Sequence, residues 1–275
     1  MAETRSVAGD VRGGANPPEP DQYDWPAIVD GLERYLRLRS IPVGMKMFES
    51  ESEMEQVDRI RRPQAKHTYD QVVAQARLMG WTVGITNDDL AAAQCGAVLG
   101  LRPQNKEWLS GERMAGVWYE TEADAAAHQA ALDAVPYGRY EAVAVSPLVQ
   151  GRLDPPDICL IYATPGQMII LINGLQFAGY RKYNFSCVGE SACGDSWGRA
   201  LTTGEPSVSI PCYAERSFGG VQDDELLMAI PPRFLPKAVD GLARLHKNGL
   251  RYPIPTLGIQ ADPSGILARS YGGKF

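Results

Sequence analysis

The chain has 275 residues, of which 44% are hydrophobic and 22% are charged, close to the composition of globular proteins. It carries 27 Lys and Arg against 33 Asp and Glu, and this net charge of −6 argues against binding to nucleic acid or to anionic membranes. No uncharged apolar run reaches the roughly 20 residues that a membrane helix needs. The composition therefore excludes a largely disordered chain and a membrane-spanning one.

Residues 1–22 are rich in Gly, Pro and charge, which predicts a flexible N-terminal tail. They lack the apolar core of a signal peptide, so we expect the protein in the reducing cytoplasm. Residues 23–275 are predicted to form a single globular domain that carries a Cys-rich site.

The first half of this domain alternates helical and strand patterns. Thr68 is followed by Gln71 at the spacing of a capping box, which predicts the start of a helix that ends near Gly80. The elements expected here are helices at 25–38 and 68–80 and strands at 42–48 and 81–86.

The second half continues this alternation as far as residue 173. Its expected elements are strands at 117–119, 142–145, 158–162 and 223–232 and helices at 121–132, 165–173 and 235–246. Residues 180–220 are rich in Gly, Ser and Cys and are expected to form a loop region. We therefore predict an α/β (α+β) fold, with a mixed sheet, flanking helices and a Cys/Gly-rich loop region in the C-terminal third.

The five cysteines are an odd number in a cytoplasmic chain, so we do not expect a disulfide framework. Cys159 stands in an apolar run and is interpreted as core packing. Cys95, Cys187, Cys193 and Cys212 stand in polar segments beside glycines, where thiolates suit iron–sulfur clusters, zinc or copper(I). The spacing contains no C-x2-C pair and does not choose among these metals.

Four segments carry a resemblance to a known family: IPVGMKM at 41–47, TNDDLAAAQC at 86–95, CGDS at 193–196 and SIPCYAER at 209–216. With them the chain resembles the uncharacterised ArCR family (domain of unknown function 169) over roughly residues 28–250. The resemblance implies cysteines at the positions of Cys95, Cys193 and Cys212, and in many members a fourth at the position of Asp70. It has no counterpart for Cys159 or Cys187.

Three thiolates with one non-cysteine position would hold a [4Fe–4S] cluster that leaves one iron open to substrate. Such an iron acts as a Lewis acid on a hydroxyl or carbonyl group. The leading hypothesis is therefore an iron–sulfur lyase of the hydratase or dehydratase type that acts on an oxygen-bearing, anionic small molecule. In this scheme Asp70 is a weak fourth ligand or a free acid or base, His67 is a second candidate for proton transfer, and Arg216 holds the anion.

Other interpretations stay open. Cys187 is an alternative fourth ligand, which would make an iron–sulfur electron-transfer or metal-binding accessory protein. A metal-free module that binds a small anion is a third function. Asp70 would then stabilise only the start of its helix, His67 would be an exposed loop residue, and Arg216 would form a structural ion pair. His128 and His246 are expected at the surface, and the sequence leaves a homo-oligomer open.

Overall fold

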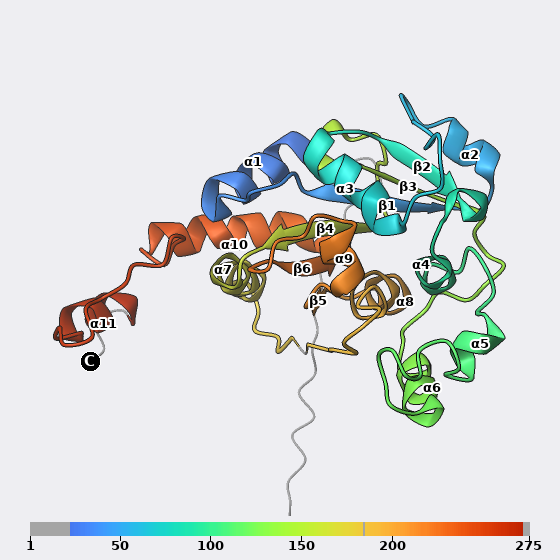
Figure 1. Cartoon of the computed structure of the whole chain (residues 1–275). Coiled ribbons are helices and arrows are strands. Elements are labelled where there is room, and N and C mark those ends of the chain that lie inside the picture. Colours follow the sequence, from blue (N-terminus) through green and yellow to red (C-terminus); the bar gives the residue numbers. More distant parts are fainter. Residues whose placement is uncertain (1–22, 184, 272–275) are drawn as a thin grey trace, which may run out of the picture.

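The computed structural model describes residues 23–183 and 185–271. The predicted tail at 1–22 lies outside the described residues. The described chain forms one six-stranded sheet with the order β2-β3-β1-β4-β6-β5, and every pairing between its strands is antiparallel (Figure 1). The strands are β1 Val43–Phe48, β2 Val83–Thr86, β3 Ala142–Pro147, β4 Ile158–Ala163, β5 Ser207–Ser209 and β6 Leu226–Ile230.

The α+β class is confirmed, but the sheet is antiparallel where we expected a mixed one. The reason lies in the strand order. Strands β1 and β2 are joined through a helix and run in the same direction, as the alternation of strand and helix predicted. Strand β3 lies between them and pairs antiparallel with both, so they do not pair with each other. Which strands become neighbours depends on long-range pairing, which the local pattern does not encode.

Three helices cover one face of the sheet: α1 Trp25–Leu36, α7 Pro165–Gln176 and α10 Leu235–Lys247. Helix α10 buries Leu235, Ala238, Leu242 and Leu245, at the spacing of an amphipathic helix. It also approaches α7 so closely that a Cβ on Gly241 would lie 2.0 Å from the Gly174 carbonyl oxygen. The cluster formed on this face includes Cys159, which is fully buried as expected.

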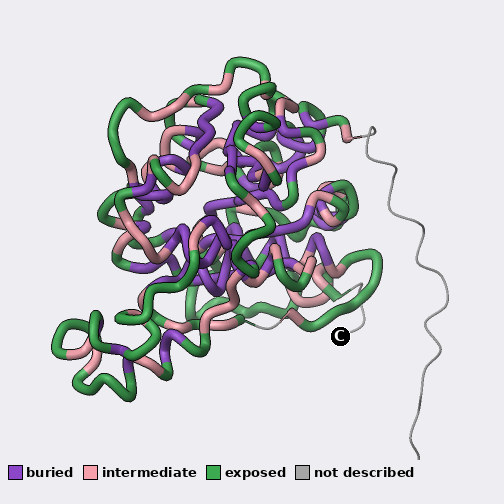
Figure 2. Tube along the Cα trace, turned by 90° about the vertical axis from the view of Figure 1, so that its right-hand side faces the viewer, coloured by how far each residue is buried: buried purple, intermediate pink, exposed green. Residues whose placement is uncertain are grey.

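The opposite face packs against α3 Tyr69–Met79, α4 Ala93–Val98 and α8 Arg199–Thr203. The predicted capping box starts α3: Gln71 N donates to Thr68 Oγ1 at 3.2 Å, and Thr68 N donates to Gln71 Oε1 at 2.9 Å. Behind it, the rings of Tyr69 and Trp197 meet edge to face, 4.8 Å apart. Figure 2 shows the buried residues concentrated along the sheet and the helix faces that contact it.

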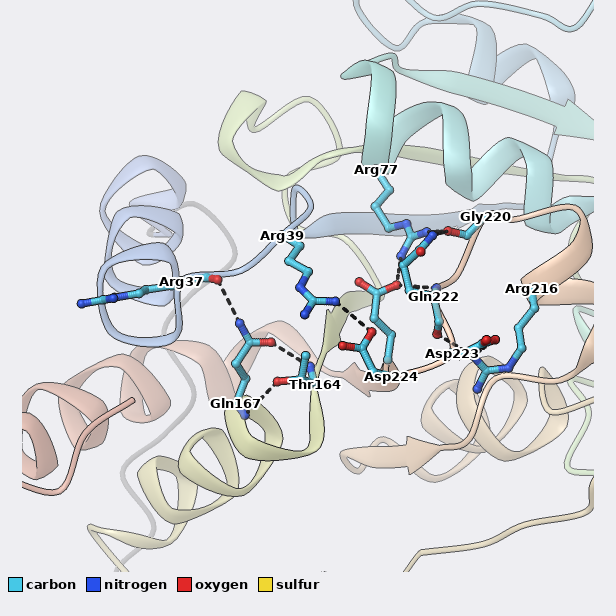
Figure 3. Close-up of polar contacts among 11 residues, drawn as sticks. Arg37, Arg39, Arg77, Thr164, Gln167, Arg216, Gly220, Gln222, Asp223 and Asp224 are labelled. Carbon is cyan, nitrogen blue, oxygen red and sulfur yellow. Dashed lines mark hydrogen bonds and ion pairs between the residues drawn. The ribbon is translucent and has the colours of Figure 1, made fainter. Parts of the chain in front are cut away.

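A buried ion pair fixes the position of α3 relative to residues 219–225. Arg77 Nη1 lies 3.2 Å from Glu225 Oε2, and Arg77 Nη2 donates to the carbonyl oxygens of Gly219 at 3.1 Å and Gly220 at 3.0 Å (Figure 3). The guanidinium also stacks on the ring of Tyr162, 4.2 Å from its centroid. This network places helix α9 Tyr213–Ser217 beside the first turn of α3.

Two sequence-based expectations about local structure were wrong. Residues 117–119 form a turn rather than a strand. The segment 180–220 is not a continuous loop, because it contains a π-helical turn at Gly194–Gly198, helices α8 and α9, and strand β5. The remaining helices are α2 Glu51–Glu55, α5 Lys106–Leu109, α6 Glu122–Ala130 and α11 Ser264–Ser270. Within the described ranges, no helix is long and apolar enough to cross a membrane.

Candidate functional site

Asp70, Cys95, Cys193 and Cys212 line one cavity of about 360 Å³, which we call the thiol pocket. They come from four separate segments: the first turn of α3, the middle of α4, the residue before the π-helical turn and the residue before α9. Figure 1 shows α4, α8 and α9 grouped on the opposite side of the sheet from α1, α7 and α10. The fold therefore brings together residues that are far apart in the sequence.

Local structure holds each of these side chains in place. The capping box of α3 fixes Asp70 within the first turn, and Asp70 is only 4% exposed. Cys193 precedes a turn that packs tightly on the segment after α6, since a Cβ on Gly198 would lie 2.0 Å from the Asp133 carbonyl oxygen. Cys212 caps α9, and its N–H donates to Glu215 Oε2 at 3.0 Å. The pocket is thus built on defined backbone positions.

The pKa values of Cys95, Cys193 and Cys212 are all raised, so the three thiols are protonated in the absence of a bound cation. The neighbouring Cys193 thiol and burial raise the pKa of Cys95. The Cys95 thiol lowers the pKa of Cys193, but burial together with the charges of Cys212, Asp70 and Glu215 outweighs it, and the net change is upward. Burial, followed by the charge of Glu215, raises the pKa of Cys212 to about 12. A nearby cation would reverse these shifts by favouring the thiolates.

Two buried carboxyl groups accompany the thiols. Burial raises the pKa of Asp70 to about 6, although hydrogen bonds from its own backbone and from Thr68 oppose the shift. Burial and the charge of Asp70 raise the pKa of Glu215 to about 8. Glu215 Oε1 is buried and has no hydrogen-bond partner among the described residues. Glu215 was not predicted from the sequence. It stands three residues after Cys212, which is the same capping-box spacing that predicted the start of α3 at Thr68 and Gln71.

The donor set is rich in acidic groups and poor in cations. Within the described ranges, no three His, Cys, Asp or Glu side chains are arranged around the position of a single metal ion. The thiols instead lie along the walls of a cavity. Among the residues that the structure describes, Arg113 is the one basic side chain that lines the thiol pocket.

Three other sequence candidates do not line the thiol pocket. His67 directly precedes Thr68, which lines the pocket, but the Nδ1 atom of His67 is 2.7 Å from the Ala65 carbonyl oxygen. Arg216 donates to the Gln222 carbonyl oxygen and lies beside Asp223 (Figure 3). Cys187 is exposed. Their proposed roles in proton transfer, anion binding and ligation receive no support from this placement.

His128, expected at the surface, is buried behind the pocket. Its Nε2 lies 2.7 Å from the carbonyl oxygen of Glu190, and its Nδ1 contacts the Gln129 amide at 3.1 Å. Glu190 itself lines the thiol pocket, and burial raises its pKa. His128 therefore helps to hold the segment that leads into Cys193. The sequence did not predict this burial, because a histidine in an Ala-rich helix is expected to face solvent, whereas α6 buries this polar side chain.

The fold and this cavity define an α+β protein with a buried pocket of thiols and carboxyl groups. The chain belongs to the uncharacterised ArCR family (domain of unknown function 169), whose model matches residues 31–241. All residues that line the thiol pocket fall inside this range. No curated protein and no solved structure matches the chain.

Proposed function

We propose that the protein is an iron–sulfur enzyme of the hydratase or dehydratase type, in which Cys95, Cys193 and Cys212 hold a [4Fe–4S] cluster. The observation that carries this proposal is the meeting of three thiols and Asp70 in one cavity from four segments of the chain. The substrate is an oxygen-bearing, anionic small molecule, and the compartment is the reducing cytoplasm, where an exposed cluster survives.

The donor set supports a cluster better than a single ion. Cysteine thiolates are the usual ligands of iron–sulfur clusters, and each binds a different iron. Three cysteine thiols that line one cavity suit that mode of binding. The raised pKa values of the thiols and of Asp70 and Glu215 also mean that these groups favour their protonated, neutral forms in the iron-free pocket. Bound iron would supply the missing positive charge.

When bound, a cluster with one open iron supplies a Lewis acid for the substrate's hydroxyl or carbonyl oxygen. Asp70 supplies proton transfer, because a carboxyl group with a pKa of about 6 exchanges protons readily near neutral pH. In dehydration the Asp70 carboxylate would take the proton from carbon while the C–O bond breaks, and the hydroxide that leaves would receive that proton and depart as water; hydration would run the same transfers in reverse. Glu215 keeps its own proton at neutral pH and so limits the negative charge around Asp70.

The placement of Cys187 favours an open site over a closed one. A fourth thiolate would complete the cluster and make an electron carrier. Cys187 is exposed and does not line the thiol pocket, whereas Asp70 does. The proposal therefore uses three cysteines as ligands and keeps the Asp70 carboxyl group beside the open position for proton transfer.

Anaerobic purification followed by iron and sulfide analysis tests the proposal. We expect about four irons and four sulfides per chain in the wild type, and loss of most of both in Cys95→Ala, Cys193→Ala and Cys212→Ala. The matched control is Cys159→Ala, since Cys159 is equally buried but lies in the cluster on the other face of the sheet. Equal iron in all five proteins, or none in any, would contradict the proposal. Loss of iron in Cys187→Ser would identify Cys187 as the fourth ligand.

A further inference from the structure

Arg113 is a cation without a partner at the thiol pocket. Its guanidinium makes no hydrogen bond or ion pair with any residue that the structure describes, whereas Arg216, the sequence candidate for an anion clamp, is engaged elsewhere. Asp70 and Glu190, which line the same pocket, are not close enough to pair with it. An unpaired guanidinium at a cavity is free to bind a carboxylate in a bidentate manner.

The segment that carries Arg113 is held against the rest of the protein on both sides. Gly111 adopts φ of 85° and lies so close to α6 that a Cβ there would be 2.0 Å from the Glu122 carbonyl oxygen. Met114 is 1% exposed and accepts a contact from the Gln129 amide at 3.3 Å. Arg113 therefore sits on an anchored turn, which lowers the entropy cost of using it to bind a ligand.

A second contact ties this segment to α9, the helix that Cys212 caps. The ring of Trp118 meets that of Tyr213 edge to face, 5.9 Å apart. Tyr213 is the first residue of α9. The position of Arg113 is thus coupled to the wall of the pocket that carries one of the three thiols.

The remainder of the lining combines apolar side chains with the polar side chains of Thr68, Gln94 and Ser191. Trp108 and Phe218 contribute aromatic rings, and residues 91–93 and Ala214 contribute methyl groups. Phe218 is 52% exposed, so its ring is open to a ligand as well as to solvent. Flat rings and methyl groups favour a ligand with a flat, apolar body.

From these observations we propose that the thiol pocket takes a small monocarboxylate with a flat apolar body, such as an aryl-substituted carboxylic acid, and that Arg113 binds its carboxylate. This inference rests on the proposed function in taking the thiol pocket as the substrate site. A more highly charged ligand such as a phosphate ester fits less well, because one guanidinium faces two carboxyl groups in the lining. The volume of about 360 Å³ lies at the small end of the range for small-molecule sites.

Binding is measured by calorimetry and by intrinsic tryptophan fluorescence, to which Trp108 in the pocket lining contributes, on the anaerobically purified wild type. The probes are 3-phenylpropionate, its neutral amide 3-phenylpropanamide and the short carboxylate propionate. We expect 3-phenylpropionate to bind at least about tenfold more tightly than either of the others, because only it uses both the charge and the apolar lining.

Variants separate the role of Arg113 from general charge. Arg113→Gln is expected to weaken 3-phenylpropionate about tenfold and to leave the amide unchanged. Arg113→Lys should lose less, because it keeps the charge but not the forked geometry. Arg102→Gln is the control, since Arg102 lies outside the lining of the thiol pocket.

Two results would overturn the inference: equal binding of 3-phenylpropionate by the wild type and Arg113→Gln, or no preference of the wild type for that probe. Iron and sulfide are measured on the same samples. Arg113-dependent binding in a protein that never contains iron would count against the iron–sulfur proposal alone. A normal iron content without such binding would count against the carboxylate site alone.

Discussion

The buried carboxyl group of Glu215 is expected to make the iron-free protein less stable as the pH rises. Burial and the charge of Asp70 raise the pKa of Glu215 to about 8 from an ordinary value of 4.5, against the opposing effects of the Cys212 N–H and Arg216. The folded state therefore holds this proton more tightly than the unfolded state. Stability contributed by such a group is present below the ordinary pKa and is lost as the pH rises toward the folded pKa.

The two pKa values set the size of the effect. Between about pH 5 and about pH 8, Glu215 alone removes roughly 3 to 4 kcal/mol from the free energy of unfolding. For a chain of this size, that corresponds to a fall of roughly 10 °C in Tm. Burial raises the pKa of Asp70 as well, so it acts in the same direction at the lower end of this window. Glu215→Gln keeps an acceptor oxygen for the Cys212 N–H but has no proton to lose.

Urea unfolding of the iron-free, reduced protein across this pH range measures the effect. The wild type should lose stability with rising pH, and Glu215→Gln should flatten most of that dependence. Glu120→Gln, at an exposed position, is the control and should follow the wild type. A wild type that becomes more stable toward pH 8, or a Glu215→Gln variant with the same pH dependence, would refute the reasoning.

Asp70→Cys should close the proposed open position: iron content is retained or improved while turnover disappears, because thiolate binds iron more strongly than carboxylate. Retained turnover in that variant would contradict the assigned role. Arg77→Ala should lower the free energy of unfolding by about 3–5 kcal/mol, because it leaves Glu225 buried without its cation. Arg39→Ala breaks the exposed pair with Asp224 and should cost about 1 kcal/mol or less in the same urea titration. Equal losses in these two variants would show that burial of the first pair does not matter.

Elements with strong local signals could be predicted from the sequence. The capping box of Thr68 and Gln71 and the stop at Gly80 placed α3 within a residue or two, because these groups act over three or four neighbouring positions. The apolar run at 158–162 predicted β4, which is buried along its whole length between two layers of helices. The predicted strand at 117–119 was wrong. Its three large apolar residues resemble a short strand, but they form a turn at the surface.

The candidate site was predictable only in part, because its geometry depends on long-range packing. Spacing and the family resemblance singled out Cys95, Cys193 and Cys212, which line the thiol pocket, but not the burial of Glu215 beside them. The role suggested for Arg216 came from its proximity to Cys212 in sequence. Cys212 is the N-cap of α9 and has an extended backbone, so the rule that residues four apart share a helix face does not apply to this pair, and Arg216 faces the 222–223 turn.

The central claim is that three cysteines hold one cluster whose fourth iron is open. Mössbauer spectroscopy of the iron-labelled, anaerobically purified protein tests it most directly, because it resolves irons with different ligands. The account predicts one iron that differs from the other three, because it alone lacks a thiolate from the protein. Four equivalent irons, or mononuclear iron in place of a cluster, would contradict it.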